Sequence, residues 1–241
     1  MRVPFRGGSR KSVVLLSGGL DSAVNFKMAL DCGDVVTAIT FNYGQRAWRQ
    51  ERSAAAKMCK RFGVRHMVLA LEWLGQLAPT PLTTRNRPLP HLQRKDLDGT
   101  AGQRISDTVW VPNRNGVFVN IGAAVAEASG ATQVVAGFNA EEAARFPDNR
   151  PEFIRATNAA LRWGTRGRVC LVSYTQTLDK AAILTLGRRV EAPLDLCWVC
   201  YDGSRRPCGR CESCLRFRRA AERAGMVEWL LALGVMPCER T

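Results

Sequence analysis

Histidine, lysine and long hydrophobic segments are scarce in this sequence. Of its 241 residues only 2 are histidine, and 29 of the 35 basic residues are arginine rather than lysine. No stretch approaches the ~18 uncharged apolar residues of a membrane-spanning helix. The basic start of the chain is followed by a short apolar run, residues 12–16, which is too short for the core of a secretory signal. We therefore expect no membrane segment and a cytoplasmic location.

Acidic charge is scarce as well. The chain carries 21 acidic residues against 35 basic ones, which gives a formal net charge of +14. Such an excess indicates an acidic partner (a nucleotide, a nucleic acid or an acidic protein surface) or an arginine-rich composition without functional meaning. The hydrophobic fraction of 46% and the charged fraction of 23% are typical of a folded domain, and they exclude a disordered or collagen-like chain.

Cysteine, by contrast, is concentrated in one part of the chain. Five of the 9 cysteines fall between residues 197 and 214, where Cys-x-x-Cys pairs stand in a loop with glycine and proline. Tight turns let such pairs direct two sulfur atoms at one ion, so we expect a structural Zn²⁺ site rather than disulfides, which need an oxidising compartment. No histidine accompanies the cluster, as is typical of a closed, non-catalytic site. The spacing alone leaves five candidates for four ligand positions: Cys197, Cys200, Cys208, Cys211 and Cys214.

Apolar β-branched runs alternate with segments of helical periodicity along most of the chain. The expected strands are residues 12–16, 35–41, 64–73, 132–138 and 168–174. The expected helices are residues 22–30, 47–62, 117–130, 151–164, 178–190 and 211–225. This alternation predicts an α/β fold with a doubly wound parallel sheet over residues 1–195, followed by a small zinc-binding lobe with C-terminal helices over residues 196–241. Residues 75–108 have little periodicity, and we expect an insertion or a mobile segment there.

A short glycine-containing loop, Ser17–Ser22, joins the first expected strand to the first expected helix. Glycines at such a turn let backbone N–H groups point at one anion, and the helix N-terminus adds partial positive charge. The two serine hydroxyls can donate to the same phosphate, and Asp21 can cap the helix or help to hold Mg²⁺. The loop matches neither the dinucleotide-binding nor the Walker glycine pattern. An ordinary tight turn between strand and helix is the alternative interpretation.

The Ser-Gly-Gly-Leu-Asp-Ser loop resembles the pyrophosphate loop of the N-type ATP pyrophosphatases, which adenylate an oxygen of their substrate and release pyrophosphate. Four further segments, Phe-Asn-Tyr-Gly-Gln-Arg (41–46), Val-Pro-Asn-Arg-Asn (111–115), Pro-Asp-Asn-Arg-Pro-Glu-Phe (147–153) and the cysteine segment, resemble the 7-cyano-7-deazaguanine synthase (QueC) family. The resemblance covers about residues 12–220. It implies an ATP-dependent carbon–nitrogen ligase that converts 7-carboxy-7-deazaguanine and ammonia into a nitrile, through an adenylate and an amide, in queuosine biosynthesis.

The same resemblance implies roles for individual residues. ATP would be bound by Ser17, Gly18, Gly19, Leu20, Asp21, Ser22 and Tyr43. The catalytic residues would be Lys180, Arg114 and Asp21, where a cation can offset the charge that shifts as pyrophosphate leaves. The substrate would contact Gln45, Arg46, Glu142, Asp148, Arg150, Glu152 and Phe153. The Cys-Tyr start of the zinc motif implies Cys200, Cys208, Cys211 and Cys214 as ligands and leaves Cys197 spare.

Blander interpretations stand beside several of these roles. Lys180 could be a solvated helix residue, Arg114 could serve in a structural ion pair, and Glu152 with Phe153 also suits a plain helix N-terminus. A tRNA-modifying enzyme or a zinc-ribbon nucleic-acid binder would explain fewer of the motifs, so we do not expect a nucleic acid as partner. Family members often dimerise, which suggests a homodimer.

Two departures from the family pattern concern the acceptor. The residue after Tyr-Gly-Gln-Arg is Ala47, where the family usually has histidine, and the stretch Glu142–Arg150 lacks the usual Ser-Gly-Tyr sequence. The loss of an imidazole removes a general base or an ammonia ligand. Two hypotheses follow: a divergent nitrile synthase that uses ammonia, or an enzyme resembling the QueC-like anti-phage proteins, which join the deazaguanine to an amine of a protein partner.

Overall fold

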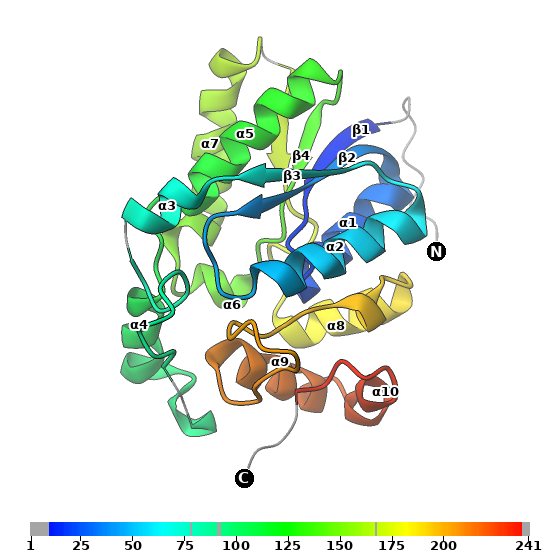
Figure 1. Ribbon diagram of the computed structural model, residues 1–241. Coiled ribbons are helices and arrows are strands. Elements are labelled where there is room, and N and C mark those ends of the chain that lie inside the picture. The colour runs from blue at the N-terminus through cyan, green and yellow to red at the C-terminus, as the bar shows by residue number, and fades with distance from the viewer. Residues whose placement is uncertain (1–9, 78, 91–92, 167, 238–241) are drawn as a thin grey trace.

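The computed structural model describes residues 10–77, 79–90, 93–166 and 168–237. A parallel sheet lies at its centre, with the strand order β3-β2-β1-β4-β5. The strands are β1 (Arg10–Leu15), β2 (Gly33–Asn42), β3 (His66–Ala70), β4 (Gln133–Val135) and β5 (Cys170–Val172). Each strand overlaps a predicted one, and helices cover both faces of the sheet (Figure 1). The predicted doubly wound α/β fold is therefore confirmed.

Alternate residues of β1 supply two hydrophobic cores, one on each face of the sheet. Val14 packs against α1 (Leu20–Cys32), α2 (Trp48–Phe62) and α8 (Lys180–Arg189), as the members of that cluster show. Val13 faces the other way, toward α5 (Arg114–Ala128) and α7 (Pro151–Gly164). Both valines are 0% exposed. The period-2 alternation of a strand thus produces the three layers of the domain.

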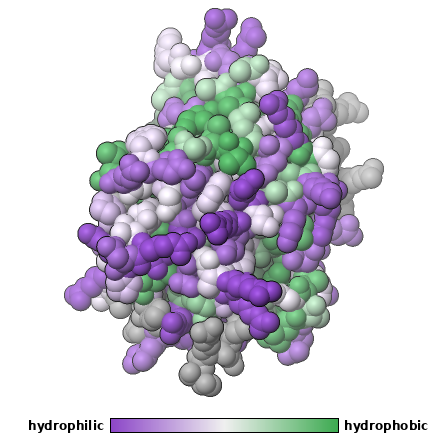
Figure 2. Space-filling model, in the orientation of Figure 1, coloured by the Kyte–Doolittle hydropathy of each residue, from purple (hydrophilic) through white to green (hydrophobic). Residues whose placement is uncertain are grey.

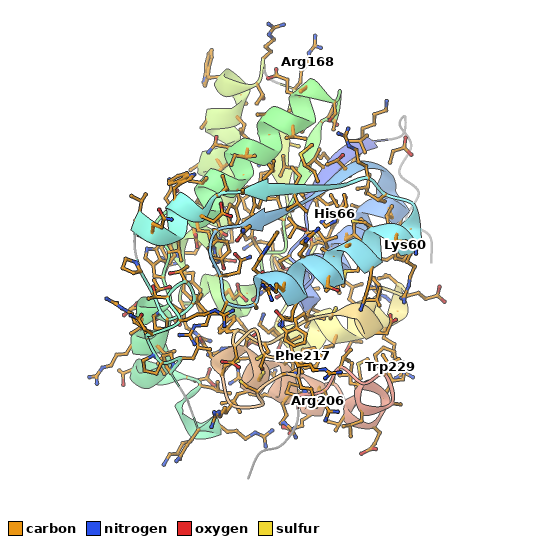
Figure 3. All side chains as sticks on the ribbon, in the orientation of Figure 1. Lys60, His66, Arg168, Arg206, Phe217 and Trp229 are labelled. Carbon is orange, nitrogen blue, oxygen red and sulfur yellow. The ribbon has the colours of Figure 1, made fainter. Side chains whose placement is uncertain are left out.

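The C-terminal residues add a further layer beneath α8 (Figure 1). It consists of the cysteine loop, α9 (Glu212–Arg223) and α10 (Val227–Ala232), preceded by the short 3₁₀ turn η3 (Leu194–Leu196). Phe217 projects from α9 toward the helices below the sheet (Figure 3) and is buried in the same core as Val14. The hydrophobic core therefore continues across the boundary expected between residues 195 and 196.

Residues 75–108 contain more regular structure than their composition predicts. The 3₁₀ turn η1 (Arg94–Asp96) and the helix α4 (Gly99–Thr108) follow the short helix α3 (Glu72–Leu77), while residues 78, 91 and 92 lie outside the described part. Between η1 and α4, Leu97 is 1% exposed and its carbonyl accepts a hydrogen bond from Arg216 of α9. The helix was missed because its glycine-containing, mostly polar segment carries little helical signal. The residues just before it, Leu97 and Asp98, are held by Arg216 and Arg219 of α9.

Two short elements complete the chain, α6 (Ala140–Ala143) and the 3₁₀ turn η2 (Pro147–Asn149). No helix among the described residues combines the length and the apolar character needed to cross a bilayer. On the face drawn in Figure 2, hydrophobic residues gather around α5 and the edge strand β3, where Val68 is 40% exposed.

Candidate active site

The sheet brings the predicted loops together at one point. The strand order reverses between β1 and β4, and doubly wound sheets bind ligands in the crevice at the carboxyl ends of such strands. The loop after β4 lies directly against the start of α1, since a Cβ on Gly137 would fall 2.8 Å from the Ser22 nitrogen. A cavity of about 270 Å³ opens at this point and is lined by both loops.

The loop Ser17–Ser22 has the geometry of an anion-binding turn. The Ser17 and Ser22 hydroxyl oxygens lie 3.1 Å apart, and the N–H of Gly19 donates to Ser17 Oγ at 3.3 Å. Gly18 has a φ of +80°, and a Cβ there would come within 2.8 Å of the Ala54 side chain in α2. Only glycine fits that position. Because no side chain caps the N-terminus of α1, its partial positive charge faces the cavity.

Lys180 joins three elements at the edge of this loop. It is the first residue of α8, where the Asp179 side chain accepts from the Ala182 N–H at 2.8 Å and caps the helix. Lys180 Nζ donates to Asp21 Oδ2 at 2.8 Å and to Glu142 Oε1 at 2.9 Å. The other oxygen of Asp21, Oδ1, is buried and has no hydrogen-bond partner in the described structure.

Burial and the neighbouring charges shift the pKa values of Lys180, Asp21 and Glu142 in opposite directions. Burial alone would lower the pKa of Lys180, but Asp21 and Glu142 together raise that pKa well above its usual value. Burial raises the pKa of Asp21, and the opposing attraction of Lys180 does not cancel the effect. The pKa of Glu142 is lowered, because Lys180 outweighs the desolvation of that carboxylate. The ammonium is thus permanently charged beside a loop suited to phosphates.

A second group of polar residues belongs to the same cavity. Asn113, in the left-handed region with a φ of 53°, starts α5 so that Arg114 is its first residue. Arg114 Nη1 donates to the Tyr43 hydroxyl at 3.3 Å, and its guanidinium carbon lies 5.6 Å from the centre of the Tyr43 ring. Burial raises the pKa of Asp148, although the neighbouring Arg114 counteracts it. The side chains of Tyr43, Arg114 and Asp148 line the cavity.

The predicted ATP and substrate residues divide into two groups. Those that line the cavity are Ser17, Gly19, Leu20, Asp21, Ser22, Tyr43, Gln45, Arg114, Glu142, Asp148 and Lys180. The amide of Gln45 is already engaged, since it accepts from the Tyr43 N–H at 2.9 Å and donates to the Phe41 carbonyl at 2.9 Å. Gly18 belongs to the loop without lining the cavity.

Four predicted substrate residues lie outside the cavity lining. Arg46 donates to the carbonyl oxygens of residues 84 and 85 at 2.8 and 3.1 Å and also to that of residue 87. Arg150 donates to the Ala143 carbonyl at 3.1 Å, and exposed Glu152 pairs with a neighbouring arginine of α7 at 2.6 Å. The Phe153 ring packs edge-to-face on Phe138, with 6.0 Å between ring centres. Their side chains secure the surrounding loops and helix in this structure.

Sequence reasoning did not single out several residues that the fold brings to the cavity. The Trp110 and Phe146 rings are nearly parallel at 11° with centres 5.9 Å apart, and both line the cavity. Glu51 and Asn149 also line it. Trp110 and Phe146 stand directly beside the Val-Pro-Asn-Arg-Asn and Pro-Asp-Asn-Arg segments, so an aromatic residue flanking each motif was the signal available.

The cysteine segment forms a compact cluster of sulfur atoms. The four Sγ atoms of Cys200, Cys208, Cys211 and Cys214 all lie within 4.8 Å of one another, and the residues are buried. Backbone N–H groups of Cys208 and Cys211 donate to the sulfurs of Cys200 and Cys208 at 3.2 and 3.3 Å. Cys197 is outside the cluster, and its thiol donates to the Pro193 carbonyl at 3.8 Å. Four convergent sulfurs are a donor set that could hold a tetrahedral metal ion.

Two arginines of α9 form ion pairs within the protein, whereas Arg205, Arg206 and Arg210 of the cysteine loop are exposed. Arg216 is 5% exposed and pairs with Glu212 at 2.9 Å, while Arg219 pairs with Asp98 at 2.6 Å. Both arginines also pair with Glu141, at 3.4 and 3.0 Å. Glu141 in turn accepts from the backbone N–H at the start of α8 at 3.1 Å. This network ties the cysteine-containing lobe to the start of α8 beside the cavity and neutralises part of the positive charge that the sequence indicates.

The comparisons with known proteins agree with this geometry. The family model for "Queuosine biosynthesis protein QueC" matches residues 11–225. A 7-cyano-7-deazaguanine synthase of Pelotomaculum thermopropionicum is 49% identical over 217 residues, which covers 90% of this chain and 98% of the relative. The synthase of Desulforamulus reducens is 48% identical, with 89% and 95% covered. That of Methanosarcina mazei is 39% identical, with 92% and 97% covered. The chain belongs to the QueC family of queuosine biosynthesis proteins.

Proposed function

We propose that this protein synthesises 7-cyano-7-deazaguanine from 7-carboxy-7-deazaguanine, ammonia and ATP. The observation that carries the proposal is one cavity lined by two unlike groups of residues. One group is the phosphate-type loop with Lys180, and the other consists of Arg114, Asp148 and aromatic rings. An adenylating enzyme needs this combination, because the substrate carboxylate must meet the α-phosphate of ATP in line with the leaving pyrophosphate.

The phosphates of ATP would be bound at the loop Ser17–Ser22. Their ligands there would be the backbone N–H groups at the start of α1 and the hydroxyls of Ser17 and Ser22. Lys180 would offset the charge that accumulates on pyrophosphate as it leaves. The buried, unpartnered Asp21 Oδ1 is an oxygen ligand of the kind that Mg²⁺ takes. Mg²⁺ bound there would neutralise phosphate charge.

The residues of the second group fit the chemistry of a guanine-like base. Buried Asp148 can accept hydrogen bonds from the ring N–H and the exocyclic amine of the base. Arg114 can hold the substrate carboxylate by charge-assisted hydrogen bonds. Trp110 and Phe146 offer flat apolar surface against which the ring can stack.

The reaction proceeds through two activations. A carboxylate oxygen attacks the α-phosphorus of ATP, the bond to the bridging oxygen breaks, and pyrophosphate leaves. Ammonia then forms a C–N bond at the acyl carbon, and AMP departs with the electron pair of the broken C–O bond to leave an amide. A second ATP activates the amide oxygen in the same way. Loss of AMP and of the nitrogen-bound protons gives the nitrile.

The four clustered cysteines would bind Zn²⁺ as thiolates. All four are buried, which suits a closed structural site. The lobe that they stabilise supplies Trp198, Tyr201 and Ser213 to the cavity lining. Zinc would thus support activity by holding one wall of the site in place.

Ammonia is the acceptor that the relatives support. Relatives with 49%, 48% and 39% identity carry the name of the nitrile-forming synthase. An amine of a protein partner remains the rival acceptor, motivated by Ala47 in place of histidine. Pyrophosphate exchange into ATP tests the shared first step, and we expect it to depend on 7-carboxy-7-deazaguanine. Exchange without that substrate, or none with it, would contradict the proposed function.

A further inference from the structure

Ammonia must be released from ammonium inside the site, and none of the roles assigned above provides a base for this step. At neutral pH ammonia exists mainly as ammonium, whereas only the uncharged form can attack a carbonyl carbon. The site therefore needs an anion that binds ammonium and accepts its proton. Ala47 lacks a titratable group, and His66 bonds Thr40 Oγ1 at 2.7 Å without lining the cavity. His91 lies outside the described residues.

Glu51 lies where such an anion is needed. It is in the first turn of α2, and the backbone carbonyl of the same residue approaches the phosphate loop, 2.8 Å from the position of a Cβ on Gly18. Glu51 Oε2 accepts a hydrogen bond from Gln45 Nε2 at 2.9 Å. No hydrogen bond to its other oxygen, Oε1, is present among the described residues, and Glu51 is one of the residues that line the cavity.

The other carboxylates of the cavity are engaged elsewhere. Asp21 and Glu142 share the ammonium of Lys180. Asp148 accepts from Asn149 Nδ2 at 3.1 Å and is the group suited to the substrate base. Glu51 accepts its hydrogen bond from a neutral amide, as Asp148 does, but unlike Asp148 it is not required for the substrate base. Its charge is therefore available to a cation, although Arg114 lies within electrostatic range.

Ala47 and Glu51 lie one helical turn apart and face the same cavity. The Glu51 N–H donates to the Ala47 carbonyl at 2.9 Å, and both residues line the site. Residues at this spacing share one face of a helix. The methyl group of Ala47 fills less space beside the carboxylate than an imidazole would, which leaves room for a small cation.

We propose that Glu51 binds ammonium in this cavity and acts as the base that releases ammonia, an assignment that rests on the proposed function. A proton passes from ammonium to Glu51 Oε1, and the freed lone pair forms the C–N bond at the acyl carbon of the adenylate. The C–O bond to the phosphate breaks, and AMP leaves with its electron pair. The second proton that nitrogen loses on becoming an amide passes to that phosphate.

The surroundings of Glu51 suit a base. Burial raises the pKa of Glu51, and the hydrogen bond from Gln45 and the charge of Arg114 oppose the rise only in part. Tyr43 also faces this carboxyl, and burial keeps its hydroxyl neutral by raising the pKa of the phenol. A carboxylate with a raised pKa takes a proton from ammonium more readily than an exposed one.

The test compares the wild type with Glu51→Gln, which preserves the shape of the side chain and its hydrogen bond to Gln45. Hydroxylamine replaces ammonium in a parallel assay, because it is uncharged at neutral pH and needs no base. We expect substrate-dependent pyrophosphate exchange and hydroxamate formation to stay within about threefold of wild type. With ammonium, kcat should fall about 10²-fold and KM should rise. Glu72→Gln is the matched control, since exposed Glu72 also binds an amide, Asn42 Nδ2, at 2.6 Å, away from the cavity.

The possible results distinguish a failure of the Glu51 assignment from a failure of the proposed function. Equal losses with ammonium, with hydroxylamine and in pyrophosphate exchange would make Glu51 a structural residue and overturn the inference alone. An unchanged ammonium KM and kcat in Glu51→Gln would also overturn it alone. A wild-type enzyme that forms hydroxamate but never amide or nitrile with ammonium would overturn the inference together with the proposed acceptor.

Discussion

Replacing Lys180 by methionine removes the cation that pairs with two partly buried carboxylates at the phosphate loop. Lys180 Nζ contacts Asp21 at 2.8 Å and Glu142 at 2.9 Å, and the three side chains are 11%, 16% and 33% exposed. Methionine keeps most of the apolar length of lysine. The substitution therefore tests charge rather than packing, and it leaves both carboxylates without a partner of opposite sign.

Removing one partner of a buried ion pair costs about 3–5 kcal/mol, and the partial exposure of Glu142 places this case near 3 kcal/mol. For a chain of this size that loss corresponds to a fall in Tm of about 6–12 °C. The folded-state pKa of Lys180 lies above 10.5 and that of Glu142 below 4.5, so the pair stabilises the fold between those values. The difference between wild type and variant should shrink as the pH falls below 4.5, where Glu142 becomes protonated.

Urea unfolding followed by circular dichroism, without nucleotide or magnesium, measures the effect. Lys27→Met is the matched control, because Lys27 pairs with Asp31 in a half-exposed i,i+4 arrangement that contributes at most about 0.5 kcal/mol. Equal losses of unfolding free energy in the two variants would refute the reasoning. So would a loss in Lys180→Met that does not shrink as the pH is lowered into the range where the carboxylates become protonated.

Three further predictions concern the metal, the phosphate loop and the substrate pocket. Cys208→Ser should lose bound zinc, measured by mass spectrometry of metal content, whereas Cys197→Ser should retain it; equal zinc in both would contradict the assigned ligands. Asp21→Ala should abolish AMP formation with zinc content unchanged, and full activity would remove Asp21 from the site. Asp148→Asn should raise the KM for the deazaguanine about tenfold or more while the KM for ATP stays near wild type. Exposed Glu152→Gln should change neither KM, and a larger effect there than at Asp148 would exchange their roles.

The sequence was most informative where periodicity and local chemistry agree. Pro151–Gly164 forms the helix predicted from its first and last residues, because proline starts a helix and the apolar spacing marks its buried face. Strand β2 was predicted within two residues at each end, since a fully buried strand is a continuous apolar run. The cysteine cluster was predictable for a similar reason, because its ligands lie close together in the sequence.

Features that depend on long-range contacts were not predictable. Helix α4 is mostly polar, and the residues just before it, Leu97 and Asp98, bind arginines of α9 more than a hundred residues later. The sequence also does not show which arginine side chain reaches the cavity. Arg46 and Arg114 both stand in family motifs, yet of the two only Arg114 lines the cavity. Glu51 escaped notice because one carboxylate in a charged helix carries no pattern until the fold places it beside the phosphate loop.

The identity of the reaction product tests the central claim most directly. Purified protein would be incubated with ATP, 7-carboxy-7-deazaguanine and ¹⁵N-labelled ammonium, and the products followed by mass spectrometry over many turnovers. The account predicts 7-cyano-7-deazaguanine with one ¹⁵N atom in its nitrile, together with AMP and pyrophosphate. Formation of AMP and pyrophosphate with neither labelled nitrile nor labelled amide would contradict it and would favour an acceptor amine on a protein.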